Sequence, residues 1–267
     1  MWQHYLLVYG VIFAAHFLTY FIICGGYTLW VNSRDKRGIE KNFIHPKRPH
    51  PRQRRAEFGW SLIGIFIYAA IGLLVYMAWE AGYTRIYTDV SEYGWGYFIL
   101  SIFIGLAIHD VYFYCQHWLL HRRWLYENIH AVHHRSYNPS PWAAYSFHPV
   151  ESILEGLILP VVIFLVPMHI GAIVIFNAIQ MTINAMGHTG VELFPKGFTR
   201  HPLTRWLTTS THHSVHHSRV HCNYGIYTNF WDWLFGTNHP EYDEVFDKAA
   251  WSSDNANADA SVTNPRT

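Results

Sequence analysis

Long apolar runs separated by polar stretches are the main pattern along the chain. Residues 5–24, 58–79 and about 95–116 form apolar runs of roughly the 20 residues that a helix needs to cross a bilayer. A fourth apolar region, 153–186, is interrupted by the segment VPMHIG at 166–171. Each half of this region is short for a full span, so we expect a helical hairpin that crosses only part of the membrane. The pattern predicts an all-α integral membrane protein with about four transmembrane helices, or three helices and a hairpin.

Positive charge is concentrated in one polar stretch, residues 32–57, which carries nine Lys and Arg. The stretch 80–94 carries one, Arg85, and the tip of the hairpin carries none. The positive-inside rule therefore places 32–57 in the cytoplasm and Arg85 outside. The first run lacks a signal-peptide cleavage site, so we expect a retained helix with its N-terminus outside. We interpret 32–57 as a solvated loop that faces lipid headgroups rather than as a surface for a partner.

The composition supports a membrane protein and leaves one outlier. Hydrophobic residues make up 51% of the chain and charged residues only 14%, well below the roughly 25% charged residues of soluble domains. A net charge of +1 gives no reason to expect nucleic acid as a partner. The three cysteines are scattered, which excludes a thiolate zinc site or a disulfide framework. The outlier is histidine, with 20 residues.

Histidines recur at spacings that suit metal binding. His117 and His121 are four residues apart and share a helix face, and a His-x-x-His-His triplet occurs twice. Imidazole binds iron, zinc and copper, and one structural zinc needs only four ligands. Nine candidates therefore fit two metals: His117, His121, His130, His133, His134, His188, His213, His216 and His217. The predicted topology puts all of them on the cytoplasmic face, in a histidine-rich helical cap.

Polar residues within the apolar runs are further candidates. Asp110 lies two helical turns before His117, and an ionisable group at membrane depth is costly. We consider it either a catalytic residue or the partner of a buried group such as His109. Gln180, Asn184 and His188 form a polar stripe on one helix face. This stripe serves either hydrogen bonding between helices or support of the metal ligands.

The order of the histidine motifs resembles that of one family. The segments that carry the resemblance are DVYFYCQHWLLH (110–121), LYENIHAVHH (125–134), NPSPWAAYSFHPVE (138–151), HTGVELFP (188–195) and HHSVHHSRVHCNYGIYTNFWDWLFGT (212–237). Together they resemble the fatty acid hydroxylase / sterol desaturase superfamily of membrane oxygenases, with Trp118 in place of the family's usual Arg. We expect membrane helices and a basic loop over 1–94, the di-metal domain over 95–240, and a polar, disordered tail over 241–267.

The resemblance implies a non-haem di-iron centre that uses O2, with the nine histidines as ligands and zinc as a substitute on foreign expression. Some members have a second histidine four residues from the position of His188. Here Glu192 and Asn184 occupy the flanking positions, so either residue, or water, would complete the ligand set, and we favour Glu192. His212 and His148 are further candidates. Asp110, Asn184 and Glu192 are the predicted catalytic residues.

The implied activity is oxidation of an unactivated C–H bond in a fatty-acyl lipid or a sterol. We favour hydroxylation over desaturation, because it is the simpler outcome. The sequence shows no haem segment, cysteine cluster or dinucleotide-binding motif, so electrons must come from a ferredoxin or a b-type cytochrome with its reductase. The predicted location is the bacterial inner membrane or the endoplasmic reticulum. A metal transporter or store, or a zinc hydrolase, would be the alternative class, although transporters hold their ligands near the middle of the membrane.

Overall fold

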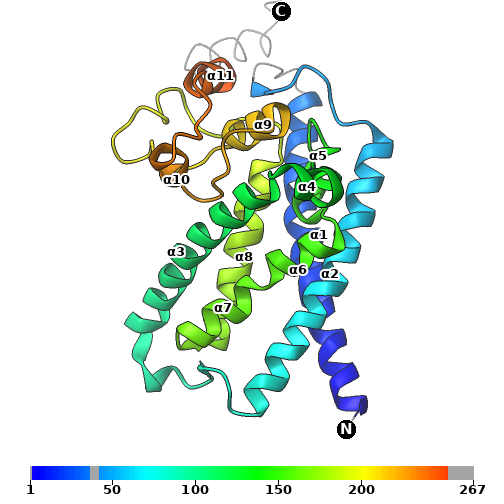
Figure 1. The fold of residues 1–267 in the computed structure, drawn as a ribbon, viewed down its shortest axis with the longest axis vertical. Helices are drawn as coiled ribbons and strands as arrows, with labels where there is room; N and C mark the ends of the chain where they lie inside the picture. Colours follow the sequence, from blue (N-terminus) through cyan, green and yellow to red (C-terminus); the bar gives the residue numbers. More distant parts are fainter. Residues whose placement is uncertain (1, 37–41, 252–267) are drawn as a thin grey trace, which may run out of the picture.

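The computed structural model describes residues 2–36 and 42–251, and most of the polar tail lies outside the described residues. Four helices are long and apolar enough to cross a membrane. They are α1 (Trp2–Lys36), α2 (Pro51–Glu80), α3 (Gly94–Leu120) and α8 (Ile170–Gly187). Figure 1 shows them as an elongated bundle. The prediction of an all-α protein with about four membrane helices is confirmed.

The interrupted apolar region forms a hairpin with unequal arms. Its first arm is divided into α6 (Pro149–Gly156) and α7 (Ile158–Leu165), and its second arm is the 18-residue helix α8. Between the arms, β2 (Met168–His169) pairs in parallel with β1 (Ile86–Tyr87), with Ile86 opposite Met168. This pairing ties the hairpin tip to the connection between α2 and α3. A short 3-10 helix, η2 (Val90–Glu92), completes that connection.

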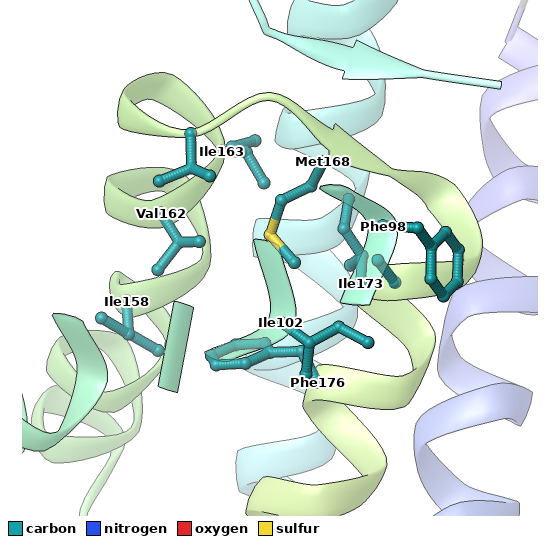
Figure 2. Close-up of a cluster of buried hydrophobic side chains, with 10 residues drawn as sticks. Phe98, Ile102, Ile158, Val162, Ile163, Met168, Ile173 and Phe176 are labelled. Carbon is teal, nitrogen blue, oxygen red and sulfur yellow. The ribbon is translucent and has the colours of Figure 1, made fainter. Parts of the chain in front are cut away.

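The lower half of the bundle is held by an apolar cluster between α3, α7 and α8. Figure 2 shows Ile102 of α3 beside Phe176 of α8, with Val162 of α7 on one side of this pair and Phe98 of α3 on the other. A Cβ atom on Gly105 would lie only 3.4 Å from both Phe176 and Val162, so the small residue allows the three helices to approach closely. The tip residue Met168 is fully buried in the same cluster. This core fixes the relative orientation of α3 and α8, whose C-terminal ends point toward the cap.

Short helices cap the other end of the bundle. The elements there are α4 (Arg123–Leu125), the π-helix η3 (Tyr126–His130), α5 (Ala131–His134), α9 (Ser210–Arg219), α10 (Phe230–Leu234) and α11 (Tyr242–Ala249). They lie at the end opposite the connection between α2 and α3 (Figure 1). The histidine-rich segments thus share one end, as predicted. The side of the membrane that this end faces stays a prediction.

A second cluster joins the cap to the helices. Tyr20 of α1 and Ile65 of α2 pack with Tyr145 and with Met181 of α8. Tyr145 belongs to the 3-10 helix η4 (Pro141–Tyr145), which follows the first histidine triplet in the chain. The Tyr20 hydroxyl donates a hydrogen bond to the carbonyl oxygen of Trp142 at 2.8 Å. The connection between the histidine triplet and α6 is therefore packed against α1, α2 and α8.

Candidate metal centre

Helix ends bring all nine predicted ligands together at the cap. His117 lies in the last turn of α3, and His121 is the residue that ends this helix. His188 ends α8 in the same way. The first triplet lies on η3 and α5, and the second lies on α9. Because α3 and α8 both direct their C-terminal ends into the cap, histidines far apart in sequence become neighbours.

The nine histidines divide into two groups. One ligand atom from each member lies within 4.8 Å of the others in both the five-histidine group (His117, His121, His130, His134 and His216) and the four-histidine group (His133, His188, His213 and His217). The adjacent residues His133 and His134 belong to different groups, as do His216 and His217 on α9. One helix therefore contributes to both groups, which holds them side by side.

The spacing of the imidazole nitrogens fits a coordinated metal. In the five-histidine group, the Nε2 atom of His134 lies 3.1 Å from those of His130 and His216. In the four-histidine group, the Nε2 atom of His213 lies 3.0 Å from His188 and 3.1 Å from His217. Ligands about 2.1 Å from one ion are roughly 3.0 to 3.4 Å apart in octahedral or tetrahedral geometry. The observed distances fall in this range.

Backbone carbonyls fix the protonation of several rings. The Nδ1 atom of His188 lies 2.7 Å from the carbonyl oxygen of Asn184, and that of His133 lies 3.3 Å from the carbonyl oxygen of Ser146. A carbonyl only accepts, so both Nδ1 atoms carry the proton and both Nε2 atoms present a lone pair. These two Nε2 atoms lie 3.4 Å apart. Two acceptors at this distance repel each other unless a cation lies between them, so the four-histidine group fits a metal ion.

The five-histidine group is held in a similar way, with one additional carboxylate. The Nδ1 atoms of His117 and His216 donate to the carbonyl oxygens of Tyr224 and Cys222 at 2.9 and 2.6 Å. The Nδ1 atom of His130 lies 2.6 Å from Oε1 of Glu151, and both side chains are buried. A carboxylate in this position orients a ligating imidazole and makes it more basic.

Burial keeps the imidazoles neutral, which metal binding requires. Desolvation lowers the pKa of His188 to about 4, although its hydrogen bond to the Asn184 carbonyl acts in the opposite direction. Burial likewise holds the pKa of His133, His213 and His217 well below the ordinary value, and neighbouring histidines lower these pKa values further. The four-histidine group is therefore preorganised in the ligand form.

Asp232 anchors the loop that supplies two of the carbonyls. Its carboxylate accepts hydrogen bonds from the backbone N–H of Tyr224 and Gly225 at 2.7 and 2.8 Å. Gly225 is required here, because a Cβ atom would lie 2.2 Å from the carbonyl oxygen of Thr228. Burial alone would raise the pKa of Asp232, but its hydrogen bonds, that with His212 first, lower it. The loop that positions His117 and His216 is thus held by a buried carboxylate.

The comparison with known families identifies the fold. The family model for fatty acid hydroxylase matches residues 102–237, about half of the chain. The chain belongs to the fatty acid hydroxylase family. Both histidine groups and the two carboxylates Glu151 and Asp232 lie inside the matched segment. No solved structure matches the chain.

The similar curated proteins include sterol desaturases and lathosterol oxidases. A Δ7-sterol 5(6)-desaturase of Gibberella zeae is 30% identical over 73% of this chain and 61% of its own length. A Δ7-sterol C5(6)-desaturase of Nicotiana tabacum is 32% identical over 74% of this chain and 72% of its length. Lathosterol oxidase of Rattus norvegicus is 33% identical over 60% of this chain. The chain spans 52% of that relative's length.

Glu192 lies outside both histidine groups of this family member. Its Oε1 atom accepts from the backbone N–H of Leu193 and Phe194 at 2.8 and 3.0 Å. Its Oε2 atom accepts from the backbone N–H and the hydroxyl of Thr211 at 3.0 and 2.6 Å. Both oxygens are therefore used at the N-terminus of α9, where a carboxylate stabilises the first turn. The structure places Glu192 as a support of α9.

The other candidates also lie beside the groups rather than in them. Asp110 accepts hydrogen bonds from the backbone N–H of Tyr227 and Thr228, each at 3.2 Å, and from the Trp231 indole at 3.1 Å. It therefore ties α3 to the loop before α10. His212 lies 3.4 Å from the Asp232 carboxylate. His148 is the N-cap of α6, where it accepts from the N–H of Val150 at 3.3 Å.

Asn184 combines a structural contact with a position at a cavity. Its side-chain amide donates to the carbonyl oxygen of Ala144 at 2.7 Å. It also lines two cavities, together with Ile226. One cavity reaches His213 of the four-histidine group, and the other extends between the helices to His16 and Gln180. Both residues therefore stand between the two cavities, one beside His213 and the other among the membrane helices.

Sequence reasoning missed two functional residues, Glu151 and Asp232. Glu151 stands in the quoted segment SFHPVE and Asp232 in NFWDWLFGT, yet neither was given a role. The signal available for Glu151 was its position at the start of an apolar helix, where an acidic residue needs a buried partner. For Asp232, the surrounding aromatic residues indicated burial of a charge. The partner of neither residue is adjacent in sequence, so the contacts could not be foreseen.

Proposed function

We propose that the protein is a di-iron lipid oxidoreductase whose reaction is desaturation of a sterol-like substrate. The observation that carries the proposal is the pair of buried histidine groups with converging Nε2 atoms, one of them bordered at His213 by a cavity. A second cavity lies among the membrane helices on the other side of Asn184. The names of the relatives support desaturation, which our sequence analysis placed second to hydroxylation. Two iron ions bound here would supply the redox chemistry that activates O2.

The reaction balances with an external electron donor. A –CH2–CH2– unit and O2, with two electrons and two protons, give an alkene and two molecules of water. Hydroxylation uses the same inputs but leaves one oxygen atom in the product. The apolar walls beside His213, among them Phe113 and Ile226, would orient the substrate and exclude water. The way these walls hold the substrate would then decide between loss of a second hydrogen, which gives the alkene, and gain of an oxygen atom, which gives the alcohol.

The four-histidine group is the proposed site of contact with the substrate. It has one ligand fewer than the five-histidine group, and catalytic metal sites keep an open position for the reacting molecule. His213 is also the only member of either group that lines one of the cavities described above. We assign the open position to water or O2 rather than to Glu192, because both Glu192 oxygens are already hydrogen-bonded.

Electrons would enter from the side of the five-histidine group. Exposed arginines follow or flank its members in sequence, namely Arg122, Arg135 and Arg219. The His121 ring lies 5.0 Å from that of Tyr224 and 6.5 Å from that of exposed His221. We propose that an acidic electron carrier docks on these arginines. The cap then faces the cytoplasm, where such carriers and the basic residues of the loop before α2 are expected.

Lipid analysis tests the proposed reaction. Total lipids are compared by mass spectrometry between cells that contain the protein and cells that contain a His217→Ala variant. Desaturation predicts products that have lost two hydrogens, whereas hydroxylation predicts products that have gained one oxygen. Identical lipid profiles in cells that supply sterols and an electron donor would contradict the proposed activity.

A further inference from the structure

A separate cavity lies where α1 and α2 meet the cap. It is lined by Thr28 of α1, by His45 and Lys47 of the segment before α2, and by Arg54 in the first turns of α2. Residues 138–141 and 189–190 form the part of the wall that belongs to the cap. None of the nine histidines lines this cavity. The cavity is therefore not part of the proposed metal centre, and its ligand must be inferred from its own lining residues.

The cavity is cationic. Lys47, Arg48 and Arg54 line it, and no acidic side chain does so among the residues that the structure describes. The buried carboxylate of Glu57 lies behind the wall, where it accepts hydrogen bonds from Gln53 and from Ser136, each at 2.8 Å. The 30-residue helix α2 also begins at Pro51, so its N-terminal N–H groups add positive potential beside the cavity. The charge of the lining favours an anion.

Several hydrogen-bonding groups at this cavity have no protein partner. The hydroxyl of Thr28, the Nε2 atom of His45 and the Nε atom of Arg54 are buried and unpaired within the described part of the chain. Each of these groups can donate a hydrogen bond. Unpaired buried donors are unusual and indicate a missing acceptor. A ligand with several anionic oxygens would supply the acceptors and compensate the charge, whereas water would supply only the acceptors.

The position of the cavity indicates the source of the anion. Thr28 and Val31 reach it from α1, and Arg54 reaches it from α2, which are both candidate membrane helices. The cavity lies where these helices meet the polar end of the bundle, which is the level expected for lipid headgroups if both helices cross a bilayer. Basic pockets between helices at this depth suit anionic headgroups. α1 also exposes large apolar side chains such as Ile22 and Leu29, along which acyl chains can lie.

We propose that this cavity binds the phosphate group of an anionic membrane lipid. The bound phosphate would accept hydrogen bonds from Arg54, His45 and Thr28 and would pair with Lys47. This proposal does not depend on the proposed redox reaction. It also gives part of the basic stretch 32–57 a specific site for one lipid phosphate, where sequence analysis predicted a solvated loop that faces lipid headgroups in general.

The same cavity is connected to the histidine groups through its walls. The backbone N–H of Ile44 donates to the carbonyl oxygen of Gly190 at 3.0 Å, and Gly190 lies two residues after His188. The Asn138 amide donates to the carbonyl oxygen of Lys47 at 2.8 Å, and residue 138 follows the first histidine triplet. A lipid bound between these segments would hold together the loops behind both histidine groups. Lipid binding should therefore raise the thermal stability of the cap.

The test uses the full-length protein in nanodiscs of phosphatidylcholine, with and without phosphatidylglycerol. Native mass spectrometry counts retained phosphatidylglycerol, and thermal unfolding gives the Tm. Wild-type protein should retain the anionic lipid and unfold at a higher temperature when it is present. Arg54→Gln and Lys47→Gln should each lower retention about tenfold, because each removes one charged hydrogen-bonding group. Lys47 is exposed, so its variant should fold even if the Arg54 variant does not.

Arg123→Gln and Arg219→Gln are the matched controls, because both arginines are exposed at the cap but do not line the cavity. Both controls should retain the lipid as the wild-type protein does. Equal loss in the controls and in the cavity variants would show a general surface-charge effect and overturn the proposal. If inorganic phosphate in pure phosphatidylcholine nanodiscs raises the Tm as much as the anionic lipid does, the assignment to a lipid is overturned.

Discussion

The five-histidine and four-histidine groups differ in what surrounds them. The five-histidine group is supported by the Glu151 carboxylate and by carbonyls of the loop that Asp232 anchors. The four-histidine group is supported by backbone carbonyls of Ser146 and Asn184 and borders a cavity at His213. The cavities described above do not reach the five-histidine group, whereas the four-histidine group has space beside His213. The difference fits the proposed division of roles, with electron entry at the first group and substrate oxidation at the second.

Loss of a ligand from either group should have the largest effect. His134→Ala removes a ligand from the five-histidine group, and His217→Ala removes one from the four-histidine group. His216→Ala is a second variant of the five-histidine group, and His133→Ala is a second variant of the four-histidine group. We expect each change to lower turnover by about 100-fold or more, because ligands and their close partners are costly to lose. Lipid product per hour, normalised to folded protein, is the measurement. Full activity in two of these four variants would contradict a two-metal centre.

The Glu151 carboxylate should matter for only one group. Glu151→Gln keeps the shape of the side chain but removes the charge beside Nδ1 of His130. We expect metal affinity of the five-histidine group to fall about 10- to 100-fold, as for other partners of ligating histidines. Asn184→Ala is the matched variant at the four-histidine group. It removes the side-chain amide but keeps the backbone carbonyl that accepts from His188. That variant should retain metal and mainly alter turnover. If competition with a chelator removes metal equally from both variants, the two groups are not supported differently.

Glu192→Ala should affect stability rather than the metal. Because the carboxylate accepts from the backbone N–H and hydroxyl of Thr211 at the start of α9, its loss should cost about 1–2 kcal/mol, as for other helix caps. Thermal unfolding measures the cost, and metal analysis at low temperature gives the occupancy. Glu192→Gln should recover part of the stability. An occupancy that falls by one metal while the Tm is unchanged would make Glu192 a ligand instead.

Charge reversal near the five-histidine group should have the smallest effect. In Arg122→Glu and Arg219→Glu, we expect the KM for an acidic electron carrier to rise about three- to tenfold, because rim charges chiefly change association. The kcat should not change, and activity with a small chemical reductant should match that of the wild-type protein. An unchanged KM at low ionic strength would place electron entry elsewhere. Arg200→Glu is a control, because Arg200 pairs with Asp247 of α11.

Sequence reasoning located the ligands because their spacing follows helix geometry. His117 and His121, and the two triplets, are local patterns that are visible without tertiary structure. The membrane helices were also predictable, because apolar runs of sufficient length have few alternatives. The first helix extends beyond the predicted residue 24 to Lys36, since Gly25 and Gly26 are tolerated within a helix that packs against α2. The predicted disordered tail over 241–267 was wrong in its first part, because α11 (Tyr242–Ala249) packs Tyr242 and Phe246 against aromatic residues of the cap. The part from residue 252 lies outside the described residues.

The supporting contacts were not predictable, because they join residues far apart in the chain. Glu57 binds Ser140 from α2 across 83 positions, and Asp110 binds Thr228 across 118. Glu192 illustrates the limit of motif reasoning. Its position four residues after His188 fits a ligand in sequence, but α8 ends at Gly187, so the helical spacing no longer applies beyond that point. The side chain instead reaches α9.

Metal content per chain tests the central claim, that two groups of histidines hold two metals in different surroundings. In protein purified from an iron-supplied host, elemental mass spectrometry measures the iron and amino-acid analysis measures the amount of protein. Their ratio gives the number of irons per chain. We predict close to two irons per chain in the wild-type protein. In His217→Ala, we predict that the four-histidine group loses its metal while the five-histidine group keeps one. A single metal in the wild-type protein, or two retained in His217→Ala, would contradict the account.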